Sequence, residues 1–147
     1  MTEAINDAVA RIAAIIGLAG IALIHALEVP DAFEETLYLG ILFIGAIVAG
    51  LVLAAALTRT SDQRVWAAAC GLAAAIMLGY VLSRTSGLPD ATLDVDNWTE
   101  PLGLASLVAE GLVVCVTGGA LASRRVADRA QLAGERSRLL RPPLAAR

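Results

Sequence analysis

The sequence has no lysine, a single histidine and two cysteines, and aromatic residues fill only 4% of its 147 positions. All eleven basic residues are arginine and alanine is abundant, a bias typical of a GC-rich bacterial genome. Cys70 and Cys115 fall in apolar stretches and form no CxxC pair, which argues against a membrane thiol oxidoreductase and favours small buried side chains. The basic start of a secretory signal is also missing, because Glu3 and Asp7 precede the first apolar stretch, and we expect no cleavage there.

Charge is scarce and unevenly distributed along the chain. Charged residues make up 17% of the sequence and apolar residues 58%, and the mean hydropathy of +0.73 is far above that of a soluble domain. A helix needs roughly 20 apolar residues to cross about 30 Å of hydrocarbon, and the alternation of a barrel strand is missing. We therefore predict an all-α four-helix transmembrane bundle with spans at about residues 12–29, 37–58, 65–83 and 101–122.

The positions of the arginines predict the orientation. Ten of the eleven lie in the N-terminus, the second loop or the C-terminal tail, and only Arg84 lies on the other side. The positive-inside rule then predicts cytoplasmic termini, an up-down-up-down topology and outward-facing first and third loops, which are acidic. We expect a multi-pass protein of the bacterial inner (plasma) membrane, surrounded by the lipid bilayer and without a nucleic-acid partner.

Small residues recur at every fourth position in two of the predicted spans. Such stripes let helix backbones approach closely in lipid. We expect the two faces to pack together inside the bundle; the alternative is that one stripe forms the seam of a homodimer or the contact with a membrane-protein partner. The stripes are Ala67, Gly71, Ala75 and Gly79 in the third span and Ala46, Gly50 and Ala54 in the second.

Residues 1–122 are predicted to form the transmembrane domain, and residues 123–147 a basic cytoplasmic tail. The tail either extends the fourth helix or lies on the anionic inner leaflet as a basic amphipathic segment. The run Arg141-Pro142-Pro143 is expected to end any helix there.

Glu110 is the most informative single residue. It lies about nine residues into the fourth span, roughly 13 Å deep at 1.5 Å per residue, and Ser106 lies one turn above it on the same face. A carboxyl group at that depth costs at least about 2.5 kcal/mol and usually faces the bundle interior. Glu110 is therefore a candidate proton, cation or metal site, or else a protonated group that holds neighbouring helices together.

His25 and Glu28 are three residues apart near the outer end of the first span, on roughly the same helix face. With Asp31, Glu34 or Glu100 nearby they form a candidate site for a hydrated divalent cation at the outer mouth, and Glu110, deeper in the bundle, is a further candidate metal ligand. The alternative is a structural histidine bonded to a backbone carbonyl or to Glu28.

Arg84 departs from the positive-inside pattern and lies among many carboxylates, with Tyr80 one turn before it. We expect Arg84 to pair near the outer surface, with Glu100 or Glu28, rather than deep in the bundle with Glu110. Together with Ser106, these side chains form a candidate polar cluster.

Four further residues indicate where the chain meets the membrane interface. Trp98 is expected to anchor the outer interface and Trp66 the inner one, as in an aromatic belt. Pro30 and Phe33 indicate that the first loop re-enters the membrane or follows its surface.

Several segments resemble an uncharacterised family of small four-helix membrane proteins from GC-rich bacteria. The resemblance spans the bundle and implies no known activity. A fainter likeness to the DoxX-type four-helix proteins rests on span count and loop placement, but the second span lacks a carboxylate, so no function is carried over. The segments are His25-Ala-Leu-Glu-Val-Pro-Asp31, Tyr38-Leu-Gly-Ile-Leu-Phe43, Gly79-Tyr-Val-Leu-Ser-Arg-Thr85 with Gly87-Leu-Pro89, and Trp98-Thr-Glu-Pro-Leu-Gly103 with Ser106 and Glu110.

The leading functional hypothesis is a non-enzymatic accessory or transport-associated membrane protein, whose outward-facing polar, acidic cluster binds a cation or a partner. The alternative is a membrane oxidoreductase, or a subunit that binds a cofactor or metal, using His25 and nearby carboxylates. A single histidine cannot supply two-histidine haem ligation within one chain, so such ligation would need the His25 side chains of two chains in a dimer.

Overall fold

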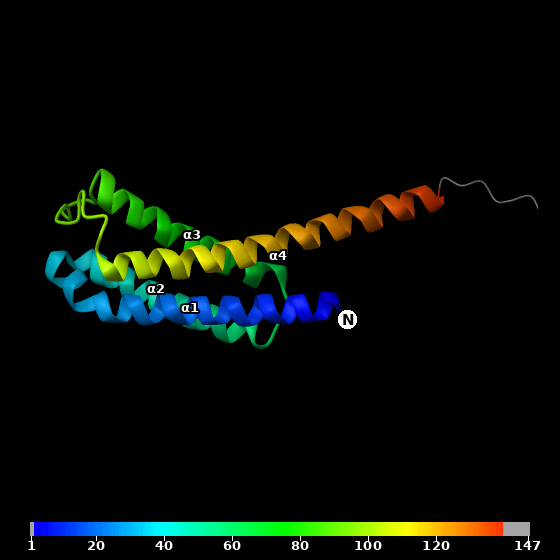
Figure 1. Ribbon diagram of the computed structural model, residues 1–147, viewed down its shortest axis with the longest axis horizontal. Coiled ribbons are helices and arrows are strands. Elements are labelled where there is room, and N and C mark those ends of the chain that lie inside the picture. The colour runs from blue at the N-terminus through cyan, green and yellow to red at the C-terminus, as the bar shows by residue number, and fades with distance from the viewer. Residues whose placement is uncertain (1, 140–147) are drawn as a thin grey trace, which may run out of the picture.

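The computed structural model describes residues 2–139, and within them the protein is built from four helices (Figure 1). These are α1 (Thr2–Glu35), α2 (Leu37–Leu57), α3 (Gln63–Thr85) and α4 (Pro101–Leu139). By length and composition, each of the four can cross a membrane. The structure thus confirms the all-α class and four helices that are long and apolar enough to cross a membrane.

The first helix is longer than predicted. We predicted a span to about Val29 followed by a loop at the interface, and the structure shows that the segment after Val29 is helical, because α1 continues through Pro30 to Glu35. Proline inside a helix removes a backbone hydrogen bond and crowds the carbonyl four residues earlier, and α1 nevertheless continues for five residues beyond Pro30. Thr36 alone separates α1 from α2, and its Oγ1 accepts a hydrogen bond from the Leu39 amide (3.4 Å) as the N-cap.

Two arginines join three parts of the chain at the end of the bundle where α2 turns into α3. Arg11 of α1 donates to the carbonyls of Leu57 (2.6 Å) and Thr60 (2.9 Å). Arg124 of α4 donates to the carbonyl of Ser61 (3.0 Å). We call this region, formed by residues 7–11, 57–66 and 124, the arginine end; its charged bonds hold α1, α4 and the α2–α3 turn together.

Trp66, expected as an anchor at the inner interface, does not present its ring on the surface of the protein. Trp66 is fully buried at the arginine end, with the guanidinium carbons of Arg11 and Arg124 at 6.0 and 4.8 Å from its ring centre. The two cations cover the indole and are attracted to its face. Trp98, by contrast, is exposed.

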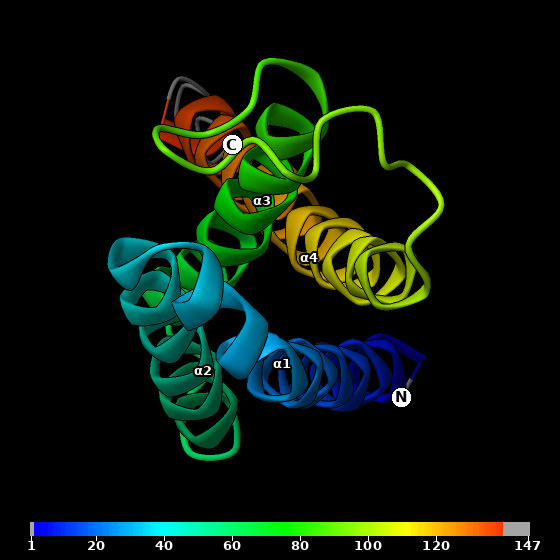
Figure 2. The same cartoon turned by 90° about the vertical axis from the view of Figure 1, so that its left-hand side faces the viewer.

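The helices are arranged around the bundle in chain order when it is viewed from one end (Figure 2). α1 packs extensively against α2 and α4, and α3 packs against α4, whereas α2 and α3 contact each other only sparsely. α1 and α4 lie close together at Gly17. A Cβ atom added at this residue would lie only 2.5 Å from Cγ2 of Val113. Gly17 was not among the small residues singled out from the sequence.

The expected packing of the second-span stripe on the third-span stripe is not what the structure shows. Gly50 of α2 instead approaches α1, where an added Cβ would lie 3.4 Å from the Leu18 carbonyl oxygen. A Cβ added at Gly71 or Gly79 of α3 would meet nothing within 4 Å among the described residues. The repeat of small residues at every fourth position predicted a packing face on each helix, but not which helix that face contacts.

Beyond Ala122, α4 continues without a break to Leu139 and projects past the other helices (Figure 1). Its side chains from Arg125 to Arg136 are exposed. The run Arg141-Pro142-Pro143 lies outside the described residues. Cys115, on the outer face of α4, is exposed and Cys70 is half-buried, so the prediction of two buried cysteines is wrong for Cys115.

Candidate functional site: a cavity at the loop end

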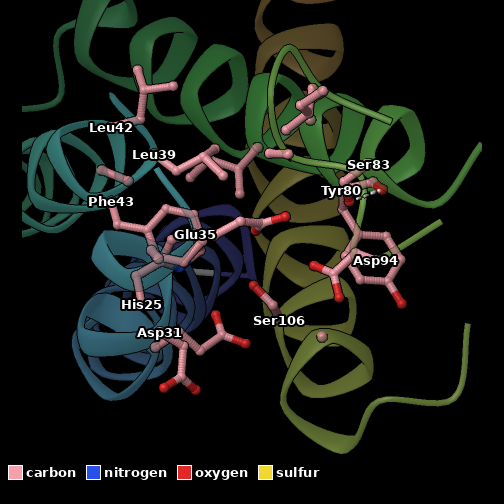
Figure 3. Close-up of a pocket in the computed structure, with 18 of the residues that line it drawn as sticks. His25, Asp31, Glu35, Leu39, Leu42, Phe43, Tyr80, Ser83, Asp94 and Ser106 are labelled. Carbon is pink, nitrogen blue, oxygen red and sulfur yellow. Dashed lines mark hydrogen bonds between the residues drawn. The ribbon is translucent and has the colours of Figure 1, made fainter. Parts of the chain in front are cut away.

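A cavity of about 840 Å³ lies where α1 meets α2 and where α3 meets α4 (Figure 3). We call this region, formed by residues 28–38 and 84–103, the loop end. Its apolar lining comes mainly from α2 and α3 and its polar lining from α1, α3 and α4, and the two adjoin where the ring of His25 lies against that of Phe43. The apolar wall includes Leu39, Leu42, Phe43, Leu72 and Ile76, and the polar wall includes His25, Glu28, Tyr80, Arg84, Ser106 and Glu110.

Small residues on α2 and α3 create this space. Gly45 and Ala46 of α2, and Ala75 and Gly79 of α3, line the cavity. A Cβ added at Gly45 or Gly79 would meet nothing within 4 Å among the described residues. The sparse α2–α3 contact and the lack of side chains at these positions therefore leave room between two helices that are neighbours in the chain.

The loop 86–100 is folded over the end of the bundle. Gly87 has a φ of +74°, which glycine adopts without strain, and Leu88 and Ala91 exchange two backbone hydrogen bonds of 2.9 Å. Ala91 packs in a small buried cluster with Ala32 and Leu39. The loop is thus fixed against α1 and α2 and forms part of the cavity wall.

Arg84 is buried (3% exposed) and forms ion pairs with both Asp94 and Glu100. Its guanidinium carbon lies 4.8 Å from the centre of the Tyr80 ring. The expected pairing of Arg84 with Glu100 is therefore present. Asp94 was not identified as a partner, because its position depends on how the loop folds; in the loop, the amide of Asp96 donates to the Arg84 carbonyl (3.0 Å).

Glu110 is fully buried at the inner end of the cavity, since it is the lining residue of α4 farthest from the loop. The Ser106 hydroxyl donates to its Oε1 (2.5 Å). Oε2 has no hydrogen-bond partner among the described residues, and neither has the Tyr80 hydroxyl. A buried polar atom of this kind is uncommon in folded proteins and calls for a physical explanation.

His25 is buried, and its Nδ1 lies 2.9 Å from the carbonyl oxygen of Ile21. A carbonyl only accepts, so Nδ1 carries the proton, and Nε2 of the neutral ring is left as an acceptor. The ring centre lies 4.9 Å from that of Phe43, and both side chains line the cavity (Figure 3). The structural reading of His25, a bond to a backbone carbonyl, matches this geometry.

The candidate metal ligands line one cavity but are not grouped for coordination. His25, Glu28 and Glu110 are all lining residues. Within residues 2–139, however, no three His, Cys, Asp or Glu side chains are placed close enough to hold a metal ion. The divalent-cation hypothesis therefore has no preformed ligand set to support it.

The cavity is rich in acidic groups. Seven carboxylates line it, against the single guanidinium of Arg84. Asp94 and Glu100 both pair with that arginine. The seven are Glu28, Asp31, Glu34, Glu35, Asp94, Glu100 and Glu110.

No protein-family model, curated protein or solved structure matches this chain. The resemblance to a family of small bacterial membrane proteins, and the fainter likeness to DoxX-type proteins, therefore stay predictions. What the protein does is inferred below from the cavity and its lining.

Proposed function

We propose that this chain is a non-enzymatic, multi-pass protein of the bacterial inner (plasma) membrane that binds a ligand in the loop-end cavity, as an accessory or transport-associated component. The observation that carries the proposal is the cavity itself, with a volume of about 840 Å³ and one apolar and one polar wall. Small-molecule sites are typically clefts of about 300–1,000 Å³ with apolar walls and a few converging polar groups.

The proposal includes an up-down-up-down topology with cytoplasmic termini and an outward-facing cavity. Its support is the arginine distribution, ten against one, together with the contacts at the two ends of the bundle. Arg11 and Arg124 meet the α2–α3 turn at one end, and Arg84 meets the acidic loop at the other. Dimer formation and a membrane-protein partner stay open predictions.

The alternative of an oxidoreductase or a cofactor-binding subunit depends on His25 as a ligand. Its ring is held between the Ile21 carbonyl and Phe43, in a cavity wide enough for an organic molecule. This arrangement gives no advantage to a redox role over simple ligand binding, so we retain the binding function.

The test is to fill the cavity without disturbing the helix that lines it. Purified full-length protein in lipid nanodiscs is titrated with three fluorescent probes that share one apolar body: 2-(1-naphthyl)ethylamine, 2-(1-naphthyl)ethanol and 1-naphthylacetate. We expect at least one probe to bind, and Gly79→Leu to weaken that binding by about tenfold or more, which corresponds to about 1.4 kcal/mol.

Gly71→Leu is the matched control, because Gly71 lies on the same helix, has open space around it and does not line the cavity. We expect its affinity to stay close to that of the wild type. Failure of all three probes to bind, or equal losses in the two variants, contradicts the proposed function.

A further inference from the structure

We infer that the cavity binds an amphipathic organic cation, a molecule with an apolar body and a primary or secondary ammonium group. The inference rests on the proposed function and specifies the chemical class of the ligand. It follows from the charge of the lining, an unpartnered buried acceptor and the shape of the apolar wall.

The charge of the lining favours a cation. Of the seven lining carboxylates, two are engaged by Arg84, which is the only arginine of the lining, and the His25 ring donates through Nδ1 to the Ile21 carbonyl rather than to a carboxylate. The remaining carboxylates have no cationic side chain within the cavity. An anionic ligand would meet their repulsion, and the one guanidinium already carries two ion pairs, with its buried Nε left without a hydrogen-bond partner among the described residues.

The inner end of the cavity presents an unpartnered carboxyl oxygen and the second ring nitrogen of His25. Glu110 is fully buried, and its Oε2 has no partner among the described residues. Nε2 of His25 is a second acceptor, since Nδ1 is used by the backbone. An ammonium group carries two or three N–H donors and a positive charge, so it satisfies the unpartnered oxygen and offsets the buried carboxylate.

A bare metal ion fits this cavity less well than an organic cation. No three ligating side chains converge within the described residues, and the space is far larger than one ion needs. The apolar wall, which includes Leu39, Leu42 and Phe43 of α2, needs an apolar partner.

The position of the apolar wall also indicates how such a molecule lies. Ala75 and Gly79 of α3 face the cavity beside Gly45 of α2, at the sparsely packed boundary of the two helices. An apolar body placed there lies next to the lipid, with its ammonium directed toward Glu110. The carboxylates of the loop end, including Asp31 and Glu34, attract the cation to this end of the bundle.

The three naphthyl probes test the inference directly, because they differ only in the charge of the polar end. In nanodiscs of zwitterionic lipid, we expect the ethylamine probe to bind wild-type protein at least about tenfold more tightly than the ethanol probe, and the acetate probe to bind weakest. Glu110→Gln is expected to remove most of this preference. Glu135→Gln, which makes the same charge change on the exposed part of α4, is expected to retain it.

The outcomes separate this inference from the proposed function. If the ethanol or acetate probe binds as tightly as the amine, the cation preference is wrong but the cavity still binds a ligand. An unchanged preference in Glu110→Gln overturns the assigned role of Glu110, whereas no binding of any probe contradicts the proposed function itself. The comparison of probes needs only wild-type protein, so a variant that fails to fold does not remove the test. If millimolar Mg²⁺ alone displaces the amine probe, the inferred organic cation is wrong and the ligand of the cavity is a divalent ion.

Discussion

Arg84 and Glu110 are two buried charged residues whose surroundings differ. The guanidinium of Arg84 meets two carboxylates and the face of an aromatic ring, so its charge is balanced within the protein. Glu110 receives one hydrogen bond from Ser106, and its second oxygen has no partner among the described residues. We therefore assign Arg84 to holding the loop in place and Glu110 to binding.

Replacing Arg84 with glutamine tests this division at the level of one residue. Asp94 and Glu100 are half-buried and would lose their cation, so we expect Arg84→Gln to lower the free energy of unfolding by about 1–3 kcal/mol. Arg64→Gln, at an exposed position on the same helix, is the matched control and is expected to change little. Reversible unfolding in mixed detergent micelles measures both; equal stabilities would contradict a structural role for Arg84.

Single residues also show how far sequence reasoning reaches. The pairing of Arg84 with Glu100 was predictable, because a lone outward arginine beside acidic loops has few other partners. The burial of Trp66 was not, because it depends on two arginines distant in sequence that meet over its ring. An exposed interfacial tryptophan is the more frequent arrangement in membrane proteins, and here local contacts cover the ring.

At the scale of helices, the number of spans followed from apolar length, but their ends did not. Hydropathy places a helix in lipid and is insensitive to whether the helix continues beyond it. α1 accordingly extends past Pro30, and α4 extends far past Ala122. The sequence also did not predict which helix faces contact each other. Small residues are so common in this chain that several helices carry a plausible packing stripe.

The α1–α4 seam supplies a prediction about helix packing. A side chain at Gly17 would collide with buried Val113, so we expect Gly17→Leu to destabilise the protein by about 1–3 kcal/mol, the usual cost of overpacking. Gly119→Leu, on α4 where an added Cβ meets nothing within 4 Å among the described residues, is the matched control. The same unfolding measurement compares them, and a Gly17→Leu protein as stable as the control would show that the seam is looser than described.

For the molecule as a whole, the proposed orientation can be tested by labelling. In a background of Cys70→Ala and Cys115→Ala, we expect Asn97→Cys to react with a membrane-impermeant maleimide on intact spheroplasts. Gln63→Cys, in the first turn of α3, is expected to react only after permeabilisation, because the arginines of that end are retained in the cytoplasm. Both side chains are exposed, so access through the membrane decides the result. The reverse pattern would invert the topology and place the cavity on the cytoplasmic side.

The whole-molecule features that were predictable are those that depend on composition: four apolar helices, and a polar cluster near Arg84. The cavity was not predictable. It lies at the sparsely packed boundary of α2 and α3, where Gly45 and Gly79 line it and have no side chains to fill it. No spacing in the sequence specifies which of several small residues faces a neighbouring helix and which faces a space.

The single residue between α1 and α2 has a consequence for how the protein is made. Thr36 is the one residue between α1 and α2, so the connection between the two helices is very short. We expect α1 and α2 to leave the insertion machinery together as a preformed hairpin, already packed along their shared face. The longer loop 86–100 allows α3 and α4 to be inserted one after the other, and the cavity is completed only when this second pair is laid against the first.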